Sequence, residues 1–213
     1  MRFNSRRSQK ASDRGWSLKG GRGVIHFVTG VAIVLASALL GAMALTPAGS
    51  APGPWARLHR PLHLPIVAPG ASCPVSGIGR INFAKYGVGK GIGPGPAYPI
   101  GFAQPGSIMQ FSYPPDPLGP FAGSLWSGAK VLWFVAPRYR GPVLIRGGKV
   151  DQPERLRFNR GKVPPKEMRI PRVVAGQRSR PSYTRLRAPG CYAYQIDGTT
   201  FSRVIVFEAE LAG

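Results

Sequence analysis

Arginine is the residue type in this chain best suited to bind a ligand. Its planar guanidinium group forms paired, charge-assisted hydrogen bonds with phosphate and carboxylate oxygens. Basic residues are densest in the segment 138–187, which contains Arg138, Arg140, Arg146, Lys149, Arg155, Arg157, Arg160, Lys162, Lys166, Arg169, Arg172, Arg178, Arg180, Arg185 and Arg187. Only Asp151, Glu154 and Glu167 oppose them there. The composition predicts a polyanion-binding face, whose first candidates are Arg178, Arg180, Arg185 and Arg187.

The arginine cluster has a second interpretation, in which it forms a dispersed and solvated surface. The formal net charge of the chain is +21, and such an excess also serves solubility. Because successive side chains of a strand point to opposite faces, neighbouring arginines can be sent apart. In the binding interpretation, Tyr139 and Tyr183 are nearby aromatic platforms. Both interpretations remain open at this point.

Enzymatic chemistry has weaker support. His26 lies in an apolar segment, and Pro61 interrupts the spacing of His59 and His63 that would align two metal ligands on a helix. The common hydrolase, zinc and redox motifs are missing from the sequence, so we expect no metal site and no cofactor. The alternative is a secreted enzyme of unknown class that uses a carboxylate pair, drawn from Asp116, Asp151, Glu154, Glu167, Asp197, Glu208 and Glu210.

Two cysteines, Cys73 and Cys191, are 118 residues apart in the sequence. Two cysteines in an exported domain predict one disulfide bond. Closing a loop of this length contributes about 4–5 kcal/mol in the chain-entropy model. Two free thiols or a two-cysteine metal site are the alternatives.

The exported placement of the domain is predicted from residues 24–45. This run contains no Asp, Glu, Lys or Arg and is long enough to cross a bilayer as a helix. A basic tail, residues 1–23, precedes it, and the positive-inside rule puts that tail in the cytoplasm. Ala42-Met43-Ala44 resembles a signal-peptidase site, so the segment is either an anchor, which we favour, or a cleaved signal peptide that releases the domain near Ala44.

A proline-, alanine- and glycine-rich spacer is expected at 46–70, and one folded domain at 71–213. Within the domain, strands are predicted at 130–135 and at 142–146, where Gly147-Gly148 is expected to end the second one. A hairpin is predicted at 191–207 across Asp197-Gly198. Weaker strands are expected at 80–84, 107–113, 155–158, 167–172 and 182–186, and a long surface loop at 86–106.

These short strands without helical crossovers predict an all-β, antiparallel sandwich. The stretch 189–194, Pro-Gly-Cys-Tyr-Ala-Tyr, resembles the late cysteine-bearing strand of immunoglobulin-like domains. The resemblance covers about the last 80 residues, and it implies that Cys73 lies on an early strand as the disulfide partner of Cys191. We therefore expect an immunoglobulin-like sandwich, preceded by one transmembrane helix and the proline-rich spacer.

The functional expectation is a non-enzymatic, single-pass membrane protein whose domain acts outside the cell membrane as a binding or assembly module. Expected partners are anionic envelope polymers, lipid headgroups or another envelope protein. Nucleic acid is not expected on that side of the membrane. A protein partner would use Phe121, Trp126 and Tyr139, whereas Trp133 and Phe134 are expected in the core.

Overall fold

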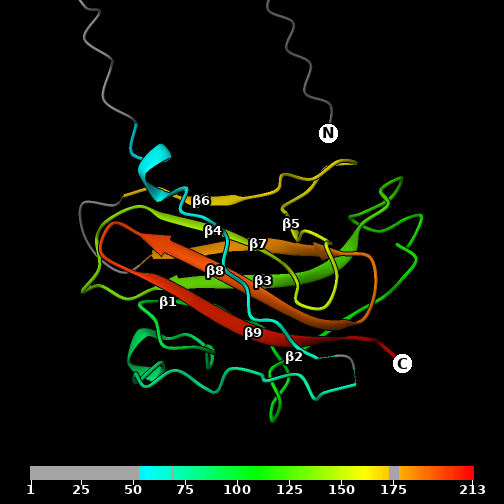
Figure 1. Cartoon of the computed structure of the whole chain (residues 1–213), viewed down its shortest axis with the longest axis horizontal. Coiled ribbons are helices and arrows are strands. Elements are labelled where there is room, and N and C mark those ends of the chain that lie inside the picture. The colour runs from blue at the N-terminus through cyan, green and yellow to red at the C-terminus, as the bar shows by residue number, and fades with distance from the viewer. Residues whose placement is uncertain (1–52, 69, 173–177) are drawn as a thin grey trace, which may run out of the picture. The chain divides into compact units, whose positions relative to one another are not determined.

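The computed structural model describes residues 53–68, 70–172 and 178–213. Two β-sheets face each other in it, which confirms the all-β, two-sheet class (Figure 1). The four-stranded sheet has the order β1 (Ala97–Ile100), β3 (Ser127–Val135), β7 (Arg178–Leu186) and β5 (Arg157–Phe158). The five-stranded sheet has the order β2 (Ile108–Phe111), β9 (Ser202–Leu211), β8 (Gly190–Gly198), β4 (Val143–Lys149) and β6 (Met168–Ile170). Two short 3₁₀ helices, η1 (Ala56–Leu58) and η2 (Ala84–Tyr86), precede the strands.

The main core lies between the two sheets and is rich in aromatic rings. Trp133 of β3 meets Tyr194 of β8 edge to face, with ring centroids 5.1 Å apart, and Tyr194 stacks on Phe207 of β9 at 4.6 Å. The Tyr194 hydroxyl hydrogen-bonds to the Thr184 hydroxyl at 2.7 Å, so its polar end is satisfied within the core. Trp133 and Phe134 are fully buried, as expected from the sequence.

The pairing of the strands corrects the expectation of a wholly antiparallel sandwich. Six of the seven strand pairs are antiparallel, but β2 runs parallel to β9, with Ile108 opposite Glu208. The two strands are far apart in the sequence, so no hairpin turn dictates their relative direction. The other ladders are antiparallel, including β3–β7 and β8–β9.

Several predicted strand limits also need correction. Gly147 and Gly148 do not end β4, because they continue its ladder opposite Tyr194 and Ala193. Glycine is needed here for close approach: a Cβ atom on Gly147 would lie 2.8 Å from Leu156 Cδ1. No strand forms at 80–84, and β1 lies inside the segment that was expected to be a surface loop.

The hairpin of β8 and β9 is confirmed, but Asp197 does not have the turn role expected of it. Asp197 is fully buried and pairs with Ser202 as part of the ladder. The connection is made by residues 199–201, and the Gly198 amide donates to the Phe201 carbonyl at 2.9 Å. The Asp-Gly pair therefore predicted the position of the hairpin correctly, but both residues belong to β8 and not to the turn.

Residues 58–68 and 70–76, which we call the N-terminal strap, cross the outer face of the five-stranded sheet (Figure 1). Leu64 and Val67 of the strap pack with Ala193 of β8 and Val206 of β9. Leu58 at its start is 1% exposed. The described part of the predicted spacer thus packs against the five-stranded sheet.

The predicted disulfide between Cys73 and Cys191 is confirmed, with the two Cα atoms 5.5 Å apart. Cys73 belongs to the strap and precedes every strand, so it does not lie on an early strand as the immunoglobulin-like resemblance implied. The bond joins the strap to β8 in the outer cluster that also contains Val204 and Val206. It fastens a covering segment to one sheet.

The predicted basic tail and apolar segment, residues 1–45, lie outside the described residues, as do residues 46–52 of the spacer. In the part of the chain that is described, no helix has the length and apolar character needed to cross a membrane.

Candidate anion-binding pocket

The four arginines predicted to form a polyanion-binding face do not lie together on the surface. Arg178 and Arg185 are 6% and 0% exposed, whereas Arg180 and Arg187 are exposed. Arg187 donates to the Glu154 carboxylate at 3.3 Å. The assignment of a four-arginine face is therefore wrong for the two buried members, whose hydrogen-bond donors point into the protein.

The guanidinium group of Arg185 is surrounded by neutral acceptors. It donates to the carbonyls of Trp126, Ser127 and Asn159 and to the Ser124 hydroxyl, the last at 2.9 Å. Its Cζ atom lies 3.9 Å from the centre of the Phe121 ring. Burial lowers the pKa of Arg185 from its ordinary value. Arg185 thus joins the loops around β7, and its full burial keeps it from contacting a ligand at the surface.

Arg178 has a comparable role at the other end of β7. It donates to the carbonyls of Gly141 at 2.9 Å, Pro171 at 2.7 Å and Tyr139 at 3.2 Å. Burial lowers its pKa, and the Tyr139 side chain partly offsets that effect. Two of its three acceptors belong to the loop between β3 and β4, so Arg178 fixes the loop that contains Arg138.

A pocket with a volume of about 580 Å³ lies beside that loop, where three segments meet. Residues 76–80 follow the strap, Gly93 and Pro94 precede β1, and Arg138 follows β3. The lining residues are Ser76, Gly77, Ile78, Arg80, Gly93, Pro94, Tyr98 and Arg138, and none of these eight is acidic. The pocket is thus assembled from parts of the chain that are distant in the sequence.

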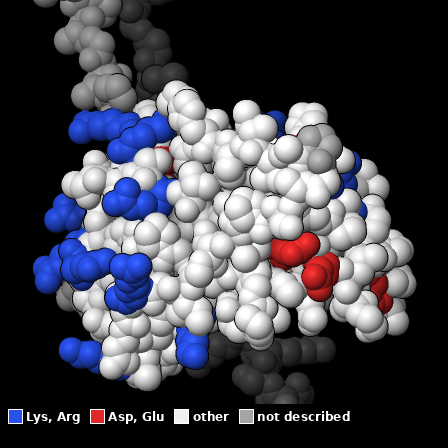
Figure 2. Space-filling view, turned by 60° about the horizontal axis from the view of Figure 1, so that its bottom comes forward, with Lys and Arg blue, Asp and Glu red and all other residues white. Residues whose placement is uncertain are grey.

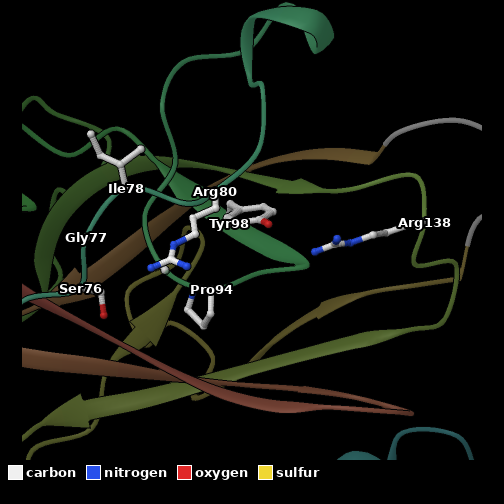
Figure 3. A pocket seen from close by; sticks show the side chains of 8 residues that line it. Ser76, Gly77, Ile78, Arg80, Pro94, Tyr98 and Arg138 are labelled. Carbon is white, nitrogen blue, oxygen red and sulfur yellow. The ribbon is translucent and has the colours of Figure 1, made fainter.

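Two guanidinium groups line this pocket. Figure 3 shows Arg138 extending toward the Tyr98 hydroxyl, and Arg80 extending past Pro94 on the other side of Tyr98. Both residues are exposed, and among the described residues neither forms an ion pair with a carboxylate. Their charges are therefore not neutralised by the domain itself, and the pocket favours anions.

Tyr98 supplies a neutral hydrogen-bond donor on the pocket wall. Its ring is 1% exposed and meets Phe83 edge to face at 5.2 Å, while its hydroxyl points toward Arg138 (Figure 3). Burial raises the pKa of Tyr98, and the charge of Arg138 and a hydrogen bond to it act in the opposite direction. The hydroxyl remains protonated at neutral pH and carries no negative charge into the pocket.

The glycine- and proline-rich segment around residue 95 is a wall of the pocket. Gly95 has φ +73°, a left-handed conformation, and a Cβ atom there would overlap the Tyr98 hydroxyl. Glycine at this position lets the backbone wrap closely around Tyr98. The predicted surface loop therefore has a specific function in the fold, which is to bring Pro94 next to the two arginines.

A second pocket, of about 280 Å³, adjoins the first and shares Pro94 and Arg138 with it. Its other lining residues are Gly95, Pro96, Tyr139, Thr200, Phe201 and Arg203. Tyr139 connects its two sides: the hydroxyl donates to the Pro142 carbonyl and accepts from the Thr199 amide, each at 2.8 Å. The Tyr139 ring packs edge to face on Phe201 at 4.9 Å.

The buried carboxylate of Asp197 holds the hairpin that forms part of the second pocket. It accepts hydrogen bonds from Arg146 at 2.7 Å, from Arg60 of the strap at 3.3 Å and from the Ser202 hydroxyl at 2.7 Å. Arg60 also donates to the Phe201 carbonyl at 2.9 Å. Arg60 and Arg146 thus share one carboxylate within the domain, whereas Arg80 and Arg138 have no carboxylate partner among the described residues.

The charged side chains are unevenly distributed over one face of the domain. Figure 2 shows Lys and Arg gathered at one end of this face and Asp and Glu at the other. The basic end is the one where the β8–β9 turn lies in Figure 1, next to Thr200 and Phe201 of the second pocket.

The remaining candidates from the sequence do not assemble into a site. His59 pairs with Glu167 at 3.0 Å, and the His63 amide donates to the Gln195 side chain at 2.7 Å. His26 lies outside the described residues. Among the residues that are described, no three His, Cys, Asp or Glu side chains gather in a way that would hold a metal ion.

Sequence reasoning included Arg138 in the basic cluster but missed Arg80 and Tyr98. Arg80 stands alone in a neutral stretch, and Tyr98 lies between prolines. The usable signal was the density of glycine and proline around them, which indicated a specialised loop but not what it surrounds.

No family model matches this chain, and neither a curated protein nor a solved structure is significantly similar to it.

Proposed function

We propose that this protein is a non-enzymatic binding module of the cell envelope, held outside the membrane by its N-terminal segment, which binds anionic groups of envelope polymers or lipids. The observation that carries the proposal is the pocket lined by both Arg80 and Arg138, neither of which has a carboxylate partner among the described residues. Guanidinium groups with free donors bind phosphate and carboxylate oxygens. The neutral Tyr98 hydroxyl adds a further donor.

The confirmed disulfide supports a location outside the cytoplasm, because such bonds persist in oxidising compartments. The basic tail and the apolar segment 24–45 support anchoring in the membrane with the N-terminus inside. An immunoglobulin-like architecture remains part of the proposal: the two facing sheets support it, while the position of Cys73 before the first strand speaks for a variant arrangement.

A role in docking another envelope protein has less support. Phe121 lies under the Arg185 guanidinium, and Trp126 is covered by Arg157 and Arg187, whose Cζ atoms lie 4.8 and 5.4 Å from its ring centre. Tyr139 packs on Phe201. The three aromatic residues considered for such docking are thus engaged within the domain.

The test of anion binding is calorimetric titration of the full-length chain, purified in a mild detergent, with glycerol 3-phosphate. Each of the substitutions Arg80→Gln and Arg138→Gln should weaken binding about tenfold or more, since a charged hydrogen bond contributes about 1.5–3 kcal/mol. Arg180→Gln is the matched control, because Arg180 is exposed and lies outside both pockets. Equal affinities for all four proteins, or no binding by the wild type, would contradict the proposal.

Anchoring is tested separately by the intact mass of the membrane-extracted protein, before and after reduction and alkylation. A full-length mass with both thiols protected until reduction supports an anchored domain outside the cytoplasm. A chain that begins near Leu45 would make the protein secreted, and free thiols would contradict the compartment.

A further inference from the structure

The two adjoining pockets together present more arginine side chains than either pocket does alone. They share Pro94 and Arg138, so Arg138 stands at their junction. Arg80 lines only the larger pocket and Arg203 only the smaller one. Together the two adjoining pockets are lined by three guanidinium groups, and we call the pair the basic groove. Among the described residues, none of the three arginines has a carboxylate partner.

We infer that the basic groove binds a linear polymer in which phosphodiester groups alternate with short polyol or sugar units; this inference rests on the proposed function. A ligand with a single anionic group would engage Arg138 and one neighbour and leave the third arginine unused. A chain of regularly spaced phosphates can engage all three in turn.

The uncharged surfaces of the groove fit the carbon units of such a polymer. Pro94 lines both pockets, and Pro96, Tyr139 and Phe201 line the smaller one. The rings of Tyr139 and Phe201 are held edge to face at 4.9 Å, and Tyr139 is fixed by its hydrogen bonds to Pro142 and Thr199. Rigid apolar surfaces between fixed charges match a chain whose charged and uncharged units alternate.

The same features favour a polymer over a lipid bilayer as the ligand. A bilayer presents its phosphates over a broad surface and attracts clusters of Lys and Arg mainly through its negative surface potential. Here two of the three arginines line a hollow of about 580 Å³ that is bounded by Ser76, Pro94 and Tyr98. A flexible chain can enter this hollow, whereas a bilayer surface cannot.

The experiment compares ligands of increasing length on the full-length chain in mild detergent. The probes are glycerol 3-phosphate and 1,3-linked glycerol phosphate oligomers of two, four and eight units, with vesicles of phosphatidylglycerol as the lipid source. Concentrations are expressed per phosphate group. We expect the affinity to rise at least tenfold from the monomer to the octamer, because the second and third contacts become intramolecular.

Substitutions separate the two halves of the groove. Arg203→Gln should lower octamer affinity about tenfold and monomer affinity by a smaller factor, whereas Arg138→Gln should lower both about tenfold. Arg180→Gln, outside both pockets, should change neither. The logarithm of the octamer binding constant should fall with the logarithm of salt concentration with a slope of about −2, at ~0.7 per phosphate contacted, and Arg203→Gln should reduce the slope by about 0.7. All three variants alter exposed side chains, and thermal unfolding verifies that each one folds.

The outcomes distinguish failure of this inference from failure of the proposed function. If the monomer binds and requires Arg138 but the octamer binds no better and ignores Arg203, the pocket is an anion site and the polymer groove is overturned. If vesicles bind more tightly than the octamer and this binding requires Arg203, the ligand is a lipid surface and the inference is also overturned. If no probe binds to the wild type, the proposed function itself fails.

Discussion

The arginines buried around β7 and the arginines of the pocket carry the same charge but play opposite parts. Arg178 and Arg185 donate their hydrogen bonds to backbone carbonyls and a hydroxyl inside the protein. Arg80 and Arg138 lie at the surface of a pocket whose lining contains no acidic residue. A high local density of arginine therefore does not locate a binding site. What matters is which acceptors the fold has already placed around each guanidinium group.

Removing the Arg185 guanidinium should have the largest effect on stability. Arg185→Met leaves buried acceptors at Trp126, Ser127 and Asn159 without donors, at a cost of roughly 3 kcal/mol in the free energy of unfolding. Chemical denaturation measures this loss. Arg187→Met is the control and should cost less than about 1 kcal/mol, because the exposed ion pair of Arg187 with Glu154 contributes little. Equal losses in the two variants would remove the distinction between buried and exposed arginines.

A smaller stability loss, about 2 kcal/mol, is expected for Arg178→Met, which frees the Tyr139 and Gly141 carbonyls. Because Arg178 fixes the loop that contains Arg138, this variant should also weaken glycerol 3-phosphate binding several-fold without touching the pocket. Denaturation and calorimetry on the same preparation check both effects. A variant that loses stability but keeps full affinity would show that the loop is positioned by other contacts, such as those of Tyr139.

The electrostatic effect of a pocket arginine can be observed at Tyr98. The positive charge of Arg138 favours the ionised tyrosine, so Arg138→Gln should raise the pKa of Tyr98 further above its ordinary value. The measurement is the ultraviolet titration of tyrosinate, taken as the difference between proteins with Tyr98 and with Tyr98→Phe. The difference titration should move to higher pH in the Arg138→Gln background. An unchanged or lower midpoint would contradict the contact between the two groups.

The smallest effect is expected for Arg180→Gln. Arg180 is exposed and belongs to neither pocket, so its replacement should change the free energy of unfolding by less than about 0.5 kcal/mol. Anion affinity should also be unchanged within a factor of two. A larger loss of affinity would extend the binding surface to β7 and restore part of the four-arginine face expected from the sequence.

Local patterns predicted the features that depend on neighbouring residues. The apolar run of β3 and the β8–β9 hairpin follow from residue type and turn position, and the two cysteines permitted only one intramolecular pair. The burial of Asp197 was not predictable, because its partners Arg60 and Arg146 are far away in the sequence. The candidate pocket was hidden for the same reason. Arg80, Tyr98 and Arg138 meet only through the packing of three separate segments.

The fastening of the strap also determines how a pulling force would travel through the domain. Tension applied between residue 53 and the C-terminus passes from Cys73 through the disulfide to Cys191, and then along β8 and β9. Residues 74–190 lie off this path, as a covalently closed loop. Every residue that lines the larger pocket, from Ser76 to Arg138, falls within that loop. The larger pocket is thus mechanically shielded, and a load on the tether would not stretch the segments that form it.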